Sequence, residues 1–270
     1  MVLSWLWLLV PSMATAGGPQ NWSSAYDARL SQAMGSDPSE AIAIYEALIA
    51  QIAPDDEQRG DVLYWLGRAR WSAGDLAGAR RSLESAQRYR SVRARVRILL
   101  GRMDAEDKAV RQLPYRQEFR LTIEPWVRGW ERGRASDLAV VDGPSGRTAR
   151  WATEVIDDES DFILFGLETD GERVSSVSMR LRSESLQGRL RVLLEDKAGN
   201  RWTVPLVSIS TDRWVDLVIP IDEFVSAETP AKRGSPDPAQ LKWFILRDVT
   251  ALHTDQQGPN ALLIDDLVVR

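Results

Sequence analysis

Arginine side chains at alternating positions are the most prominent groups that could bind a ligand. Three runs between residues 176 and 203 alternate apolar with polar side chains, and five of the polar positions are arginines; the first two runs carry four of them, Arg180, Arg182, Arg189 and Arg191, and the third carries Arg201. A period of two places such side chains on one face of a strand. We expect the connection from 183 to 188 to fold the chain back, which would set like charges opposite one another, an unfavourable arrangement in a sheet. This face therefore either lies in solvent or binds an anion, for example a uronic-acid or sulfated glycan.

Tryptophan rings are the second group that could contact a ligand. Trp126 and Trp130 flank Gly129 in the otherwise polar segment EPWVRGWERGR, which makes them the candidates for exposed, stacking rings. A position in the core is equally compatible with this pattern, because large aromatic side chains are mostly buried. Trp214 opens the run WVDLVIPI, and we interpret its ring as a packing residue of the sheet rather than a platform for a sugar.

The composition leaves little material for catalysis. The chain has no cysteine and one histidine, His253, so a thiol nucleophile, a disulfide framework and a cysteine-based zinc site are excluded. The pair Asp265-Asp266 falls in a predicted strand, where adjacent side chains point to opposite faces. A glycosidase needs two carboxylates about 5 to 9.5 Å apart across one cleft. We therefore expect a protein that is not an enzyme.

The first sixteen residues, MVLSWLWLLVPSMATA, have the features of a signal peptide cleaved after Ala16. The apolar run from Val2 to Val10 is too short to span a membrane core, which takes about 20 residues, so we expect no stable membrane span. These features predict an exported protein, periplasmic or secreted. A net charge of -5 gives no general attraction for nucleic acid.

Between Trp22 and Leu113 apolar residues recur at intervals of three and four, the period of a helix. The stretch VLYWLGRARWSAGDLAGARRSLESAQRY resembles a tetratricopeptide repeat, through Leu63, Leu66 and Gly67 on one helix and Ala79, Leu83 and Ala86 on the next. Leu66-Gly67 recurs as Leu100-Gly101, 34 residues later. The resemblance implies a groove for a protein or peptide partner, although a helical spacer is equally open. So short an array should lean on the second domain or on a partner.

Arginines are also dense in the helical half. Arg90, Arg93 and Arg97 have the spacing of one helix face, which could bind an anion. We favour the alternative that this face is simply solvated.

After Pro114 the pattern changes to short alternating runs, about nine in number, including FRLTIE at 119 to 124. No helical crossover separates them, so the sheets should be antiparallel and the architecture a sandwich. We expect 196 to 200 to form a hairpin that sets Glu195 opposite Arg201. The predicted fold class is α+β multidomain, with a signal peptide at 1–16, a short tetratricopeptide-like helical hairpin array at 17–113 and an antiparallel β-sandwich, or jelly roll, at 114–270.

The runs from Trp214 to Phe224 and Ile264-Asp265-Asp266-Leu267 resemble those of galactose-binding-like jelly rolls, particularly carbohydrate-binding modules of family 11 and the CIA30-type assembly-factor domain. The resemblance implies glycan binding on a sheet face or end loops. It also implies that a structural calcium ion is possible, for which the available carboxylates are Glu118, Glu124, Asp265 and Asp266; no other cofactor is expected. We thus expect an exported, non-catalytic protein that binds glycan through the sandwich and a protein through the helices. The alternative is an envelope assembly adaptor whose sandwich is structural.

Overall fold

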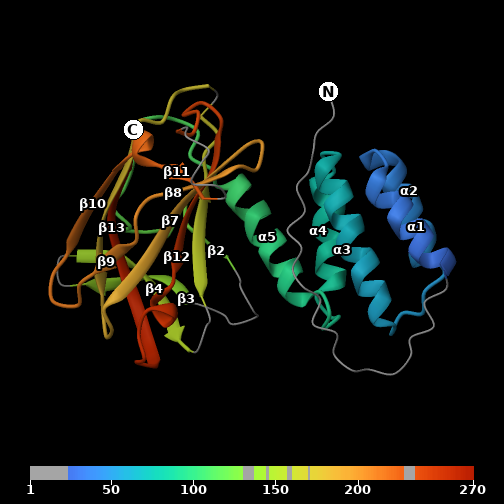
Figure 1. Cartoon of the computed structure of the whole chain (residues 1–270), viewed down its shortest axis with the longest axis horizontal. Coiled ribbons are helices and arrows are strands. Elements are labelled where there is room, and N and C mark those ends of the chain that lie inside the picture. Colours follow the sequence, from blue (N-terminus) through green and yellow to red (C-terminus); the bar gives the residue numbers. More distant parts are fainter. Residues whose placement is uncertain (1–23, 130–136, 144–145, 157–159, 170, 228–234) are drawn as a thin grey trace.

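The computed structural model describes residues 24–129, 137–143, 146–156, 160–169, 171–227 and 235–270 (Figure 1). Its first part holds five helices, each packed against the next: α1 (Ser24–Gly35), α2 (Pro38–Ile49), α3 (Glu57–Ser72), α4 (Leu76–Ala86) and α5 (Arg93–Asp107). In the described part of the chain no helix combines the length and apolar character needed to cross a membrane. The predicted signal peptide and its cleavage site lie outside the described residues.

Aspartates begin three of the helices. Asp37, Asp56 and Asp75 are the N-caps of α2, α3 and α4, and each side chain accepts a hydrogen bond from a backbone N–H of the first turn. Such caps each contribute about 1 kcal/mol, because they satisfy donors that the helix itself leaves free. The sequence of this half therefore marks its own helix boundaries.

A glycine sets the close approach of α3 and α4. A Cβ at Gly67 would lie 2.6 Å from Cγ of Leu83, so only glycine fits this contact. All six residues that carry the predicted repeat are buried: Leu63, Leu66, Gly67, Ala79, Leu83 and Ala86. The predicted helical hairpin is confirmed.

The predicted arginine stripe is wrong. Helix α4 ends at Ala86 and α5 begins at Arg93, so Arg90 lies in the intervening turn and does not share a helix face with Arg93 and Arg97. Several neighbouring arginines are paired with acids of other helices, as Arg95 is with Asp61 at 2.5 Å.

The second part of the chain is an antiparallel β-sandwich, which confirms the predicted fold class. Its strands are β1 (Tyr115–Gln117), β2 (Val127–Arg128), β3 (Asp137–Gly143), β4 (Gly146–Val155), β5 (Asp161–Gly166), β6 (Ser176–Ser183), β7 (Gly188–Asp196), β8 (Arg201–Thr203), β9 (Val207–Ile209), β10 (Val215–Pro220), β11 (Val225–Ser226), β12 (Leu241–Asp248) and β13 (Gly258–Val269). The first sheet has the order β10-β6-β13-β4-β3, with β1 on β13. The second has the order β11-β8-β7-β12-β5-β2, with β9 on β7.

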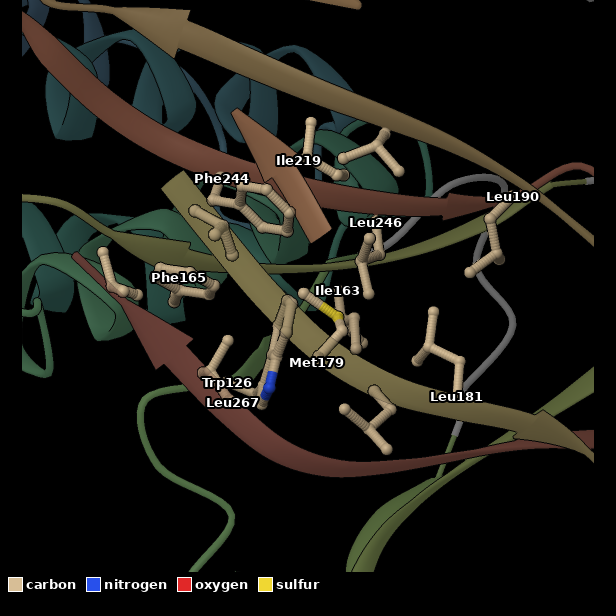
Figure 2. Packing of buried hydrophobic residues seen from close by; sticks show 14 of the residues in the cluster. Trp126, Ile163, Phe165, Met179, Leu181, Leu190, Ile219, Phe244, Leu246 and Leu267 are labelled. Atoms are coloured by element: carbon tan, nitrogen blue, oxygen red, sulfur yellow. The ribbon is translucent and has the colours of Figure 1, made fainter. Parts of the chain in front are cut away.

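The core lies between the inner faces of the two sheets (Figure 2). The predicted alternation is borne out in β6, where Met179 and Leu181 are buried, and in β7, where Leu190 is buried. Trp126 stands edge-on against Phe165, with ring centroids 4.8 Å apart. Two sheets that each bury one apolar face stabilise one another by removing that surface from water.

One predicted strand is wrong and one predicted hairpin is right. Residues 119 to 124 form no strand, since Phe119 has a φ of 52° and Leu121, which the pattern would bury, is 88% exposed. The hairpin at 196 to 200 forms as expected, with Glu195 opposite Arg201 and Gly199 at a φ of 83°.

Helix α5 packs on the outer face of the second sheet (Figure 1). A Cβ at Gly101 would lie 2.7 Å from the carbonyl oxygen of Arg128, and one at Gly166 would lie 2.7 Å from that of Ala105. Ala105 joins an apolar cluster with Leu164, Trp243 and Ile245 of the sheet. The short helical array therefore leans on the sandwich, as its length required.

An ion-pair network reinforces this contact. Both carboxylate oxygens of Glu195 accept hydrogen bonds of 3.1 Å from Arg102 of α5, and one also accepts from Arg201 at 3.2 Å. The Glu195 side chain is 8% exposed, so removing either arginine would leave a nearly buried carboxylate with one partner fewer. Lys242 contacts Glu106 of α5 at 2.7 Å. The helices end at Asp107 and the first strand begins at Tyr115; the division into separate units at 113 and 114 stays a prediction.

Replacing Gly101 should loosen the contact between α5 and the sandwich. We expect Gly101→Ala to lower the free energy of unfolding by about 1 to 3 kcal/mol, because the added methyl group meets backbone rather than a flexible side chain. Chemical denaturation measures the change. The matched control is Gly35→Ala, whose Cβ would meet nothing within 4 Å; it should leave stability unchanged or raised. Equal effects of the two substitutions would contradict close docking at Gly101.

Candidate ligand-binding face

The outer faces of the two sheets differ in what covers them. Helix α5 lies on the second sheet, and helices α1 to α5 all lie on the side of the molecule away from β10 and β13 (Figure 1). We call the outer surface of β10, β6, β13 and β4 the open face. None of the described α-helices covers it.

The structure divides the four predicted arginines between the two sheets. Strands β6 and β7 do not pair: the chain crosses from the first sheet to the second over residues 184 to 187. Oδ1 of Asn260 holds this crossing by accepting from the backbone N–H groups of Ser185 and Leu186. The predicted single face of four arginines is therefore wrong.

The reason lies in burial. Strands β6 and β7 set their apolar faces against each other across the core instead of side by side. Arg180 and Arg182 consequently point outward from the first sheet, and Arg189 and Arg191 from the second. Arg189 donates to the hydroxyl of Ser208. Arg191 is exposed and lies opposite Arg247 in β12.

Of the two predicted tryptophans, Trp126 alone falls within the described residues. Trp126 is fully buried in the core against Phe165 and Phe244, so its predicted role as an exposed ring is corrected. Trp130 lies outside the described residues. Trp126 directly precedes β2, and its ring lies among the side chains of the core (Figure 2).

Trp214 is the aromatic ring of the open face. Val215 pairs with Leu181, so Trp214 precedes the strand at the level of Arg182. The guanidinium carbons of Arg180 and Arg182 lie over its ring, 5.2 and 5.9 Å from the centroid. The ring is half-buried and packs on these side chains rather than in the core of the sandwich. Each cation over an indole contributes about 0.5 to 1 kcal/mol at an exposed site.

Most charges around Trp214 are paired. Arg150 of β4 donates two hydrogen bonds, of 2.9 and 2.8 Å, to the two carboxylate oxygens of Glu184. Arg180 lies 3.4 Å from Asp216 and opposite Asp265. These paired bonds lower the pKa of Glu184 below its usual value, and the charges of Arg150 and Arg182 act in the same direction.

Arg182 differs from its neighbours. In the part of the chain that the structure describes, it has no ion pair, and its buried Nε has no hydrogen-bond acceptor. The sequence pattern predicted Arg180 and Arg182 as ligand-binding candidates. It did not predict that Trp214, Arg150 and Glu184 lie beside them. The sequence did contain a signal for Trp214. Because Val215 pairs with the buried Leu181 and so faces the core, the alternation of a strand turns the preceding Trp214 to the outer face.

The carboxylates considered for calcium are paired with basic side chains or backbone donors. Arg116 lies 2.9 Å from Asp266 and 3.7 Å from Glu118, and Arg120 lies 2.7 Å from Glu118. Asp265 accepts from the N–H of Asp266, and burial raises its pKa. Glu124 faces Lys108 at 3.8 Å. The described residues contain no group of three acidic, histidine or cysteine side chains that could hold a metal ion, and the calcium ion stays a prediction.

Comparison with known proteins gives likeness in structure alone. No family model and no curated protein matches the chain. The family 11 carbohydrate-binding module of a cellulosomal cellulase of Clostridium thermocellum is similar over 59% of this chain and 95% of its own, at 13% identity and a TM-score of 0.43. The CBM22-1 xylan-binding domain of Xyn10C from Paenibacillus barcinonensis covers 60% and 97%, at 13% identity and a TM-score of 0.40. An exo-beta-agarase covers 57% and 24%, at 11% identity and a TM-score of 0.41. What this chain binds has to be argued from its own side chains.

The pair of Arg150 and Glu184 should make stability depend on pH. Because the folded pKa of Glu184 lies below the unfolded value of about 4.5, its contribution is present above pH 4.5 and is lost as the pH falls through the folded pKa. We expect Glu184→Gln to cost about 0.5 to 1.5 kcal/mol at pH 7 and little at pH 3, since both side chains are partly exposed. Denaturation at the two pH values measures this difference; the same loss at both would contradict it.

Proposed function

We propose that the protein is a non-catalytic binding protein whose β-sandwich holds a glycan on the open face. The observation that carries the proposal is Trp214, an aromatic ring supported by Arg180 and Arg182 on a sheet surface that no described helix covers. Glycan sites combine an aromatic ring with a few oriented polar groups, because sugars present both apolar C–H faces and hydroxyls.

The polar groups on the open face are oriented before a ligand arrives. Arg150 and Glu184 fix one another through two hydrogen bonds, and both still have exposed surface with which to meet hydroxyl groups. Binding to such a prearranged surface costs little side-chain entropy. Because its bonds to Arg150 lower the pKa of Glu184, this carboxyl is poorly suited to act as a general acid, which supports a non-catalytic role.

A second candidate function is an assembly adaptor in which the sandwich is structural. One observation in its favour is that the outer face of the second sheet already packs against another part of the chain. Helix α5 lies there, in contact with Glu195 and with the cluster around Trp243. In this role the helices would hold a protein partner. Tyr64 and Trp65 are half-exposed on α3, with Arg95 and Arg68 over their rings, and such aromatic and arginine side chains often anchor protein interfaces.

We also propose export to the periplasm or to the outside of the cell. The support comes from the apolar run and small residues of positions 2 to 16 and from the absence of cysteine in the chain.

Removing the ring of Trp214 tests the glycan proposal. On a glycan array, the wild-type chain should bind a defined set of sugars, and Trp214→Ala should lose that binding while losing only about 1 to 2 kcal/mol of stability, the contribution of the two cations over the ring. The contrasting variant is Trp126→Ala, which should cost about 3 to 5 kcal/mol because that ring fills the core.

Two outcomes would count against the proposal. Glycan binding that survives in Trp214→Ala would exclude the open face. If the wild-type chain bound no sugar on the array, the result would contradict glycan binding and favour the adaptor function.

A further inference from the structure

We infer that the open face binds a glycan that carries an oxyanion, a carboxylate or a sulfate, and that Arg182 is the residue that contacts it. The inference rests on the proposed glycan function and adds the class of ligand. It comes from the distribution of charge around Trp214, not from a general excess of positive charge, since the whole chain is acidic at -5.

The acids of the open face are already engaged by other arginines. Glu184 gives both oxygens to Arg150, at 2.9 and 2.8 Å. Asp216 lies 3.4 Å from Arg180, and Asp265 lies opposite Arg180 on the neighbouring strand. Glu184 and Asp216 therefore form their ion pairs with neighbours of Arg182, and Arg182 acts on Glu184 only through its charge at longer range.

Arg182 is left with a charge and with donors to satisfy. Arg182 is half-buried, and its buried Nε has no hydrogen-bond acceptor. The terminal nitrogens of its guanidinium group therefore reach solvent. A partly desolvated guanidinium gains more from an anion than a fully hydrated one does. Its planar fork also matches the two oxygens of a carboxylate or sulfate.

The position of Arg182 suits a sugar that rests on Trp214. Leu263 pairs with Arg182 on one side and with Arg150 on the other. Across β10, β6, β13 and β4, the open face therefore carries a row of four side chains in the order Trp214, Arg182, Leu263 and Arg150. With about 4.8 Å between strands this row is about 15 Å long. A saccharide chain lying along it would place one ring on the indole and an oxyanion substituent beside it on Arg182.

The side chain of Arg182 is also held in place. Its guanidinium carbon lies 5.9 Å from the centroid of Trp214, and Arg180 lies over the same ring at 5.2 Å. Both arginines come from β6, so they support the ring from one strand and keep the donors of Arg182 in a fixed position. A fixed donor loses less entropy on binding than a free one.

The test compares polysaccharides that differ in charge but share a backbone. The probes are polygalacturonate and its methyl ester, and dextran sulfate and dextran, measured by calorimetry with the full chain at 50 and 300 mM NaCl. We expect binding to an acidic member only, weakened at the higher salt because exposed charge is screened. The two acidic arms distinguish a carboxylate ligand from a sulfate ligand.

Variants assign the contact to a residue. Arg182→Gln should weaken binding of the acidic probe about tenfold or more, the usual effect of losing a hydrogen-bonded charge. The matched control is Arg191→Gln, an exposed arginine on the outer face of the other sheet, which should bind as the wild type does. The thermal midpoints of both variants show that they are folded.

The outcomes separate the inference from the proposed function. Equal binding of a neutral and an acidic member, or binding unaffected in Arg182→Gln, would overturn the inference and leave glycan binding intact. Weakening by Arg191→Gln alone would move the anion contact to the second sheet and overturn it as well. If neither these four probes nor a glycan array gave any binding, the proposed function itself would fail.

Discussion

The close packing of α5 on the outer face of the second sheet is the contact on which the rest of the structure depends. Two units meet there that could not bury their apolar surfaces alone: a helical array of little more than two hairpins, and a sheet that carries Leu164, Trp243 and Ile245 on its outside. Small residues, such as Gly101 and Gly166, allow the helix to approach the sheet closely. Glu195 fixes the position of the helix, because its nearly buried carboxylate is stable only while Arg102 and Arg201 lie beside it. The helices and the sandwich therefore stabilise one another.

The same contact explains how the last helix of so short an array buries its apolar side. Gly67 and Gly101 occupy equivalent places, 34 residues apart, but they meet different partners. Gly67 packs against Leu83 of the following helix, whereas Gly101 packs against the backbone of Arg128 in β2. The sandwich thus covers α5, the last helix of the array, as α4 covers α3.

Docking of α5 also decides which surface is free for a ligand. The second sheet gives part of its outer face to the helices, while the first sheet keeps the open face with Trp214 and Arg182. Charge follows the same division. Arginines are numerous in the chain, but several of those described around the two faces are paired with an acid from another segment, as Arg150 is with Glu184 and Arg102 with Glu195. A binding role for an arginine thus depends on its neighbours and not on the density of arginines in the sequence.

The sequence alone determined the elements whose signals are local. Asp37, Asp56 and Asp75 mark helix starts by satisfying nearby N–H groups, and Gly199 permits the turn that sets Glu195 opposite Arg201. Alternation in β6 and β7 identified which side chains are buried. It did not tell whether the two strands lie side by side or face each other, because a strand has the same alternation in either arrangement. That choice depended on Asn260, which is distant in sequence, and on how two apolar faces are best buried together. It separated Arg180 and Arg182 from Arg189 and Arg191, and it left Trp214 beside Arg182, since contacts between remote segments arise only when the whole core is formed.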